Sequence, residues 1–288
     1  MSNTDSAPAE VACAASSFAG VLHPREVPLG GTGMDVPPHP HTGLQTVSWL
    51  FSGEVEHRDS AGVHAIVRPG ELNLMTAGAG ICHSEVSTPA TGILHGVQLW
   101  VALPDADRDT GRDLAHYAPE PVRVPGAVLR VFLGELSGSR SPVHTFTPLL
   151  GAQVDLDPAA RVTLDVDPAF EHGVLLDQGS IEVEGTTLDL ADLAFQPTGR
   201  TALPLHNPGA HPARVLLLGG QPFAEELVMW WNFVGRSHDD IAGYRRMWED
   251  GDARFGAVEG YRGSVARLPA PPLPNATLRP RSNPKGTP

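Results

Sequence analysis

The chain has 288 residues, enough for one large domain or two domains of ordinary size. It carries 20 basic and 33 acidic residues, a formal net charge of −13. This excess of acidic residues argues against direct binding to nucleic acid or to an anionic membrane, because both need clustered positive charge. No apolar run reaches the roughly 18 residues of a membrane-spanning helix. We therefore expect a cytoplasmic, monomeric protein.

The beginning of the chain has neither the basic segment nor the long apolar core of a signal peptide, so residues 1–20 are predicted to be a disordered tail. After it, short β-branched runs alternate with turns rich in glycine and proline, which predicts an all-β fold. We divide this part into a first domain, residues 21–142, and a second domain, residues 143–264. Residues 265–288 are rich in proline, and we expect them to be disordered or to lie extended over the surface. The two cysteines, Cys13 and Cys82, are too few for a disulfide framework.

Two pairs of polar residues in the first domain predict a metal site. His39 and His41 are two residues apart, and so are His83 and Glu85. Residues i and i+2 of a strand point to the same face, so the four side chains converge if the two strands are neighbours in one barrel. One His-X-His pair is weak evidence, because a histidine is more often a surface or hydrogen-bonded core residue. Two pairs of equal spacing in strand-like sequence favour a metal. Cys82 has the opposite parity and should point away from it.

The second domain repeats the pattern of the first. The run GSIEVEG echoes GEVEHRD, and LADLAFQPTG echoes PGELNLMTAG, which suggests two copies of one β domain. The positions that correspond to the four ligands fall near Asp165 and Asp167, or on Pro204 and His206, depending on the offset. We therefore expect a metal in the first domain only, with His172 and His206 as structural or surface residues.

The region after the second repeat contains the best helix of the chain. Ser237 can cap it, and Asp240 completes an imperfect capping box. Ile241, Tyr244 and Trp248 share one face of the predicted helix. The two tryptophans that precede it, Trp230 and Trp231, are expected to serve packing.

The stretches HPHTGLQTVSWLFSGEVEHRDSAG, RPGELNLMTAGAGICHSE and HGVQLWVALP resemble the pirin family. The resemblance covers roughly residues 21–260 and implies two cupin-type jelly-roll β-barrels in tandem, with a short C-terminal helix. It also implies that His39, His41, His83 and Glu85 are iron ligands. There are two departures from the family pattern. Ala79 stands where pirins usually carry arginine, and strand-forming sequence is missing before residue 34. The second departure predicts a first barrel short of one or two strands.

Three imidazoles and one carboxylate leave two positions of an octahedral ion open, as activation of dioxygen beside a chelating substrate requires. We expect one divalent transition metal. Fe(2+) is favoured, and Mn, Ni, Co, Zn and Cu are alternatives. Glu85 could be both a ligand and the catalytic base that takes a proton from the substrate. Gln45, His57 and Gln98 are candidates for orienting the ligands, against the alternative that they are ordinary polar residues of strands.

Two functions remain open from the sequence. The first is a metal-dependent dioxygenase of the quercetin 2,3-dioxygenase type, acting on a small aromatic substrate such as a flavonol. The alternative is a regulatory protein that binds a transcription factor or a metabolic enzyme according to its metal or redox state. A deep apolar cavity at the metal would favour the enzyme, and a shallow one the regulator.

Overall fold

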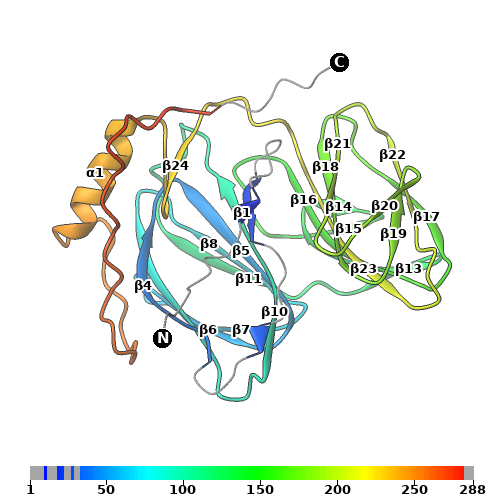
Figure 1. The fold of residues 1–288 in the computed structure, drawn as a ribbon, viewed down its shortest axis with the longest axis horizontal. Coiled ribbons are helices and arrows are strands. Elements are labelled where there is room, and N and C mark those ends of the chain that lie inside the picture. The colour runs from blue at the N-terminus through cyan, green and yellow to red at the C-terminus, as the bar shows by residue number, and fades with distance from the viewer. Residues whose placement is uncertain (1–9, 12–17, 23–26, 29–32, 282–288) are drawn as a thin grey trace.

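The structure is a computed structural model, and it describes residues 10–11, 18–22, 27–28 and 33–281. Two β-barrels lie side by side, and one helix lies at the outer side of the first barrel (Figure 1). The predicted all-β fold with a short C-terminal helix is confirmed. Most of the predicted disordered tail falls outside the described residues. Two described parts of residues 1–20 are strands: Glu10–Val11, and the first three residues of Phe18–Leu22.

The first barrel consists of a seven-stranded sheet and a four-stranded sheet. The large sheet has the order β1-β2-β10-β5-β8-β11, with β3 also paired to β10. Its strands are β1 (Glu10–Val11), β2 (Phe18–Leu22), β3 (Val27–Pro28), β5 (Leu44–Ser52), β8 (Leu72–Thr76), β10 (Ile93–Ala102) and β11 (Asp113–Tyr117). The small sheet has the order β4-β9-β6-β7, formed by β4 (Asp35–His41), β6 (Val55–Asp59), β7 (His64–Val67) and β9 (Ile81–Ser87).

The second barrel repeats this plan with a six-stranded and a four-stranded sheet. The larger sheet, in the order β12-β13-β16-β23-β18-β21, contains β12 (Val122–Val124), β13 (Ala127–Leu133), β16 (Leu149–Leu156), β18 (Glu171–Gln178), β21 (Leu193–Gln196) and β23 (Ala213–Gly220). The smaller, in the order β17-β22-β19-β20, contains β17 (Arg161–Asp165), β19 (Ile181–Val183), β20 (Thr186–Leu188) and β22 (Ala202–His206). Two further short strands, β14 (Glu135–Leu136) and β15 (Ser139–Arg140), form a separate hairpin.

The strand pairing bears on two details of the predicted organisation. Upstream of the HPH segment, β2 and β3 pair with β10, so this part of the chain adds strands to the large sheet of the first barrel. The boundary predicted at residue 142 also differs from the pairing. β13 lies before that boundary and pairs along its length with β16 of the second barrel.

The two barrels share an apolar core. Trp49 of the first barrel stacks on Phe132, with ring centroids 4.5 Å apart. Its indole N–H donates a 3.0 Å hydrogen bond to Gln153 of the second barrel. Leucines and valines from the large sheets of both barrels surround this contact. Burial of this surface stabilises the pair of barrels as one unit.

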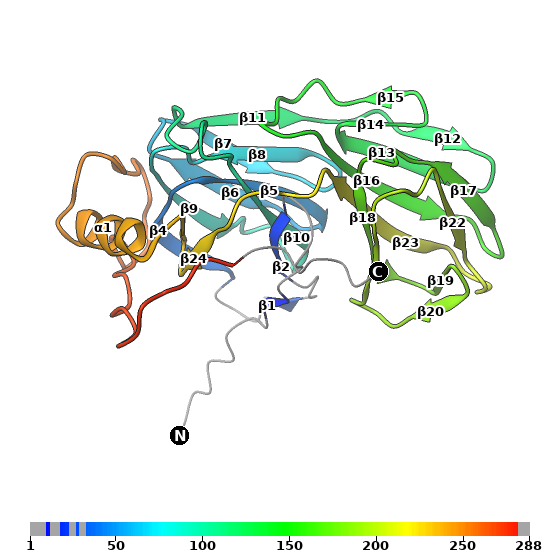
Figure 2. The ribbon, with the colours of Figure 1, turned by 90° about the horizontal axis from the view of Figure 1, so that it is seen from above.

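The C-terminal part of the chain returns to the first barrel. The hairpin of β24 (Val228–Trp230) and β25 (Phe233–Gly235) and the helix α1 (His238–Glu249) lie next to β4 (Figures 1 and 2). As predicted, Ser237 caps α1 in a complete capping box with Asp240, and Ile241, Tyr244 and Trp248 are buried. Cys82 of β9 packs in the same cluster as these three side chains. The helix therefore covers the outer face of the small sheet.

The proline-rich segment after α1 first lies extended along the helix and then reaches the start of β24, where Arg281 pairs with Leu227. The backbone N–H of Leu268 donates to the carbonyl of Pro38 on β4, and its carbonyl accepts from the indole of Trp248. Within the described part of the chain, no helix has the length and apolar character that crossing a membrane requires.

Candidate metal centre

The histidines come together because β4 pairs with β9, and among the described strands β4 forms a ladder with no other, so it lies at the edge of the small sheet. Prolines 37, 38 and 40 lack the N–H that a central strand needs, and an edge position tolerates them. His39 lies directly opposite His83 in this ladder, and an irregularity between Val36 and His39 shifts the register. Alternation along β4 then places His41 on the same face as His39.

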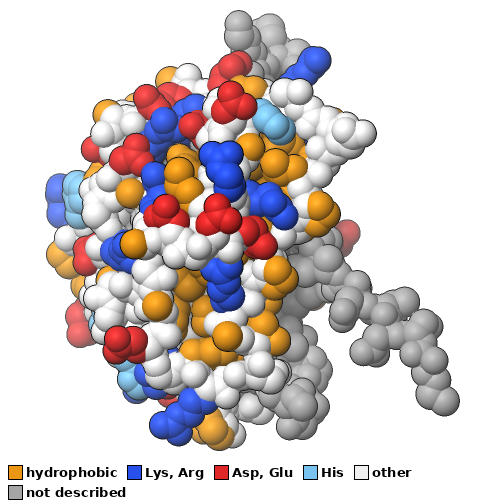
Figure 3. All heavy atoms as spheres, turned by 90° about the vertical axis from the view of Figure 1, so that its left-hand side faces the viewer, with side chains coloured by type: hydrophobic (Ala, Val, Ile, Leu, Met, Phe, Trp, Pro, Cys, Tyr) orange, Lys and Arg blue, Asp and Glu red, His pale blue; other side chains and the backbone are white. Residues whose placement is uncertain are grey.

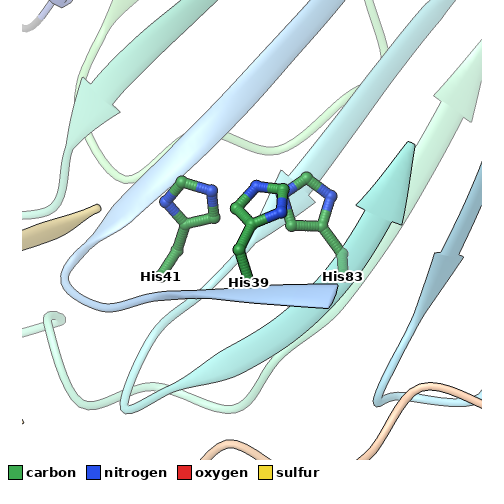
Figure 4. A group of neighbouring side chains, drawn as sticks. All are labelled: His39, His41 and His83. Atoms are coloured by element: carbon green, nitrogen blue, oxygen red, sulfur yellow. The ribbon is translucent and has the colours of Figure 1, made fainter. Parts of the chain in front are cut away.

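The three imidazoles form a compact, buried group (Figure 4). Ring centroids are 4.2 Å apart for His39 and His83, 5.0 Å for His41 and His83, and 5.1 Å for His39 and His41. Each side chain offers a ring nitrogen within 4.8 Å of the other two. This spacing suits three ligands around a single ion.

Hydrogen bonds determine which nitrogen of two of these rings faces the group. Nδ1 of His39 lies 2.9 Å from the carbonyl oxygen of Pro37, and Nδ1 of His41 lies 3.1 Å from that of Asn232. A carbonyl only accepts, so Nδ1 carries the hydrogen in both rings and Nε2 keeps a free lone pair. Such outer partners fix the tautomer and orientation of histidine ligands.

His83 provides the test of whether a metal fits. It is buried, and neither of its ring nitrogens has a hydrogen-bond partner among the described residues. A buried polar atom without a partner costs about 1–3 kcal/mol, so an orphaned imidazole needs an explanation. A cation bound by the three rings would satisfy it.

Burial also keeps these rings neutral, as metal ligands must be. Desolvation lowers the pKa of His39, an effect that the nearby carboxylate of Glu85 partly opposes. Desolvation lowers the pKa of His41 well below its ordinary value, and the neighbouring His39 lowers it further. The pKa of His83 falls in the same way, through desolvation first and then through the adjacent histidines.

The carboxylate of Glu85 lies beside this group but belongs to a second, overlapping one. Glu85, His83 and His57 offer atoms within 4.8 Å of one another. The amide of Gln98 on β10 donates a 2.8 Å hydrogen bond to Oε1 of Glu85, which orients the carboxylate from across the barrel. All four residues that the sequence pointed to therefore lie in one region, and His83 is common to both groups.

His57, which the sequence suggested as a residue that orients the ligands, is held by a buried carboxylate. Its Nε2 lies 3.0 Å from Oδ2 of Asp59, and the backbone N–H groups of Ala61 and Val63 bond to Oδ1. Burial alone would raise the pKa of Asp59, but the hydrogen bonds from His57 and the two N–H groups lower it overall. Asp59 is therefore an ionised anchor, which sequence reasoning had missed. Its position on β6 two residues after His57 was the available signal.

Two other sequence-based interpretations have definite outcomes. Gln45 does not contact the cluster. Its amide donates to Thr76, and alternation places it with Val47 and Trp49 on the face toward the second barrel. Cys82 points away from the histidines, as parity predicted, and desolvation raises the pKa of its thiol to about 12.

Ala79 stands where pirins usually carry an arginine, and here the side chain of an arginine from a distant segment contacts it. The side chain of Arg254, which follows α1, donates to the backbone carbonyl of Ala79 and bonds to Asp109 at 2.8 Å. Neighbouring Arg112 bonds to the backbone carbonyls of Arg254 and Phe255. This corner of the first barrel is thus tied to the segment after the helix.

In the second barrel, His206 bonds to Glu182 at 2.7 Å. His172 is buried, and neither ring nitrogen has a partner among the described residues. Both groups of metal-ligating side chains found in the described ranges are in the first barrel.

Comparison with known proteins assigns the family. The model of the Pirin domain matches residues 7–101, and that of the Pirin C-terminal cupin domain matches residues 151–256. The chain belongs to the pirin family. A Pseudomonas aeruginosa pirin relative, provisionally named quercetin 2,3-dioxygenase, is 45% identical over 253 residues, which are 87% of this chain and 78% of that protein.

Solved structures agree with this assignment. A crystal structure of quercetin 2,3-dioxygenase from Acinetobacter baumannii has 36% sequence identity and a TM-score of 0.85, covering 92% of this chain and 88% of that one. A bacterial pirin from Escherichia coli in complex with nickel(II) shares the fold, with 20% identity and a TM-score of 0.55 over 72% of this chain and 84% of that one.

Replacing His83 with Ala should deplete bound metal, because His83 is common to both ligand groups. Loss of an outer partner typically weakens metal binding 10- to 100-fold, and loss of a direct ligand should exceed about 100-fold. Metal analysis after dialysis against a chelator measures this. His206→Ala, in the second barrel, is the matched control. A His83→Ala protein that retains metal as the control does would contradict the assignment.

Replacing Asp59 with Asn keeps the shape of the anchor and removes its charge. We expect metal affinity to fall about 10-fold or more, because the orientation of His57 next to His83 and Glu85 loosens. Competition with a chelator gives the affinity, and the visible spectrum of Co(II)-loaded protein reports the ligand geometry. Glu56→Gln, a partly exposed carboxylate on the same strand, should change neither. Identical results for the two variants would show that Asp59 only stabilises the turn at residues 59–63 through its bonds to the backbone.

Proposed function

We propose that this protein is a metal-dependent oxygenase of the quercetin 2,3-dioxygenase type. The observation that carries the proposal is the convergence of three buried imidazoles beside a carboxylate inside one barrel. The related proteins named for this activity support it. The overall reaction adds both atoms of dioxygen to a flavonol-like substrate, opens its central ring and releases one carbon as carbon monoxide.

His39, His41, His83 and Glu85 are the proposed ligands of one divalent transition metal, for which we propose Fe(2+). When bound, such an ion supplies Lewis acidity and a route for electrons between substrate and dioxygen. Imidazole and carboxylate ligands also accept Ni, Co, Zn, Mn and Cu, so the occupant depends on geometry and metal supply.

Each protein group has a role that follows from its contacts. Nε2 of His39 and of His41 faces the group because Nδ1 is held by a backbone carbonyl. We assign to Glu85, whose Oε1 accepts a hydrogen bond from Gln98, the role of taking the proton from a substrate hydroxyl. The indole of Trp100 contacts the ring of His41 edge-on, with centroids 5.2 Å apart, and helps to exclude water beside it.

The charge distribution on the face that carries α1 does not favour binding of a nucleic acid. On the face that carries α1, basic and acidic side chains are interspersed, and no patch of positive charge gathers there (Figure 3). With a net charge of −13, this distribution gives a polyanion no continuous positive surface on that face.

Iron-loaded protein under air should consume a flavonol, with oxygen uptake and carbon monoxide release in equal amounts. Replacing Glu85 with Gln should lower kcat at least about 100-fold, because the base is lost. The decline of the flavonol's near-visible absorbance measures the rate. Glu54→Gln, a partly exposed carboxylate paired with Arg68, is the control and should match the wild type. Protein with full iron content that leaves every tested flavonol unchanged would refute the proposal for this substrate class.

A metal- or redox-dependent regulatory role is a second candidate, and one contact favours it. His41 bonds to the carbonyl of Asn232 in the β24–β25 turn, so the proposed ligand group touches a hairpin from the other end of the chain. Met229 on this hairpin is exposed and Trp230 is partly exposed. A change of one charge unit at the metal could therefore alter the conformation of this hairpin, whose exposed side chains a protein partner would contact.

Oxidation of the iron-loaded protein should change amide hydrogen exchange in residues 228–235 severalfold, because His41 shares a hydrogen bond with this turn. Mass spectrometry of the Fe(II) and Fe(III) forms measures it, and the β14–β15 hairpin of the second barrel is the internal control. Equal exchange in both redox states would remove the structural support for this role.

A further inference from the structure

A row of polar side chains crosses the large sheet of the first barrel. The strand registers pair Gln98 with Ser48, Ser48 with Asn73, and Asn73 with His116, on four neighbouring strands. Residues paired across a sheet point to the same face, so these four side chains form one line on one wall. None of them belongs to the proposed ligand set.

This wall faces the proposed metal site. Gln98, at one end of the row, bonds to Glu85 of the small sheet, and Trp100 on the same face of β10 contacts His41. The other end of the row is the solvent side, where the side chain of His116 is 47% exposed. The row thus runs from the metal centre to the surface along the inside of the barrel.

Apolar layers border the row on both sides. One includes Trp100, Met75 and Leu114 with Ile81 of the small sheet. The other is formed by Leu50, Leu94, Val55 and Val67, again from both sheets. A polar stripe between two apolar layers matches a flat apolar molecule with oxygen substituents along it.

Asn73 provides the independent sign of a ligand. The residue is buried, with 3% of its surface exposed. Its Oδ1 is bonded to Nδ1 of His116 at 2.7 Å, while its Nδ2 has no partner among the described residues. Because Nδ2 is a donor, the matching group is an oxygen atom. An amide that stays half-satisfied in a buried position costs about 1–3 kcal/mol unless a bound molecule completes it.

We infer that this row is the substrate-binding wall and that Asn73 donates a hydrogen bond to a hydroxyl or carbonyl oxygen on the part of the substrate remote from the metal. Neighbouring strands are about 4.8 Å apart, so Asn73 lies roughly 10 Å from Gln98 along the row. A substrate that reaches from Glu85 to Asn73 therefore needs more than one ring. The preferred class is a multi-ring aromatic molecule with a chelating oxygen pair at one end and a hydroxyl at the other. This inference rests on the proposed function and adds a specificity-determining residue to it.

The test compares two ligands that differ only at the distal ring: 3-hydroxyflavone, and a flavonol with hydroxyl groups on that ring. Zinc-loaded protein is used so that binding is measured without turnover, by quenching of tryptophan fluorescence. Asn73→Leu should weaken binding of the hydroxylated flavonol about 3- to 10-fold, the value of one neutral hydrogen bond, and leave 3-hydroxyflavone unchanged. Asn73→Gln, which keeps the amide, should restore part of the difference.

The matched control is Gln45→Leu, which removes a buried amide from the opposite face of the same sheet and should not alter the ratio of the two affinities. Metal content and thermal unfolding of each variant show that the barrel is intact. Equal weakening of both ligands, or none, would overturn the inference and leave Asn73 with a bound water only. Wild-type protein that binds neither flavonol would overturn it together with the proposed substrate class. Binding with the predicted ratio but no oxygen uptake by the iron form would support the wall and refute only the proposed reaction.

Discussion

The pairing of β4 with β9 is the constraint on which the candidate site depends. It sets His39 opposite His83, and strand alternation brings His41 to the same face. The same ladder places Cys82 on the other face, under α1. A register slip of one residue would turn each side chain to the opposite face of the sheet. The imidazoles would then pack under the helix, and the Cys82 thiol would point into the barrel. The prolines that make β4 an edge strand and the C-terminal segment that covers this edge therefore belong to the site as much as the histidines do.

The interior of the first barrel is not apolar throughout, because the strand register brings polar side chains into it. Two apolar clusters each join the large and small sheets, and the layer between them is polar on both walls. The small sheet contributes His57, His83 and Glu85 to this layer, and the large sheet contributes the row from Gln98 to His116. The core cluster of the second barrel consists of valine, leucine, isoleucine and alanine, with the buried His172 on the same face of β18 as Val174 and Leu176. The first barrel therefore has a layer of polar side chains where an apolar core would contribute packing, at a cost in stability because buried polar groups lose contact with water.

Local patterns were sufficient to predict much of this arrangement. The spacing of two residues within each ligand pair predicted the shared face, and Ser237 with Asp240 predicted the start of α1. What the sequence could not provide is which distant segments meet. His41 depends on Asn232, 191 residues away, and the carbonyl of Ala79 on Arg254, 175 residues away. The two alternatives for Gln45 stayed open for the same reason, since alternation tells which residues share a side of the strand but not which side faces the metal, and its bond to Thr76 shows it to be an ordinary polar residue of the strand.

The division of the polar layer between two walls bears on how such a site could select a substrate. The small sheet, which carries the proposed metal ligands, does not discriminate between most bound molecules, because a metal accepts any suitably placed pair of oxygen atoms. Discrimination between similar chelators must come from groups that meet the rest of the molecule, and a buried donor left unpaired by the wrong ligand provides it. In this barrel, Asn73 is such a donor, and it lies on the sheet that carries none of the proposed ligands. The family's ligand motif could therefore stay unchanged while residues on the facing sheet change the substrate.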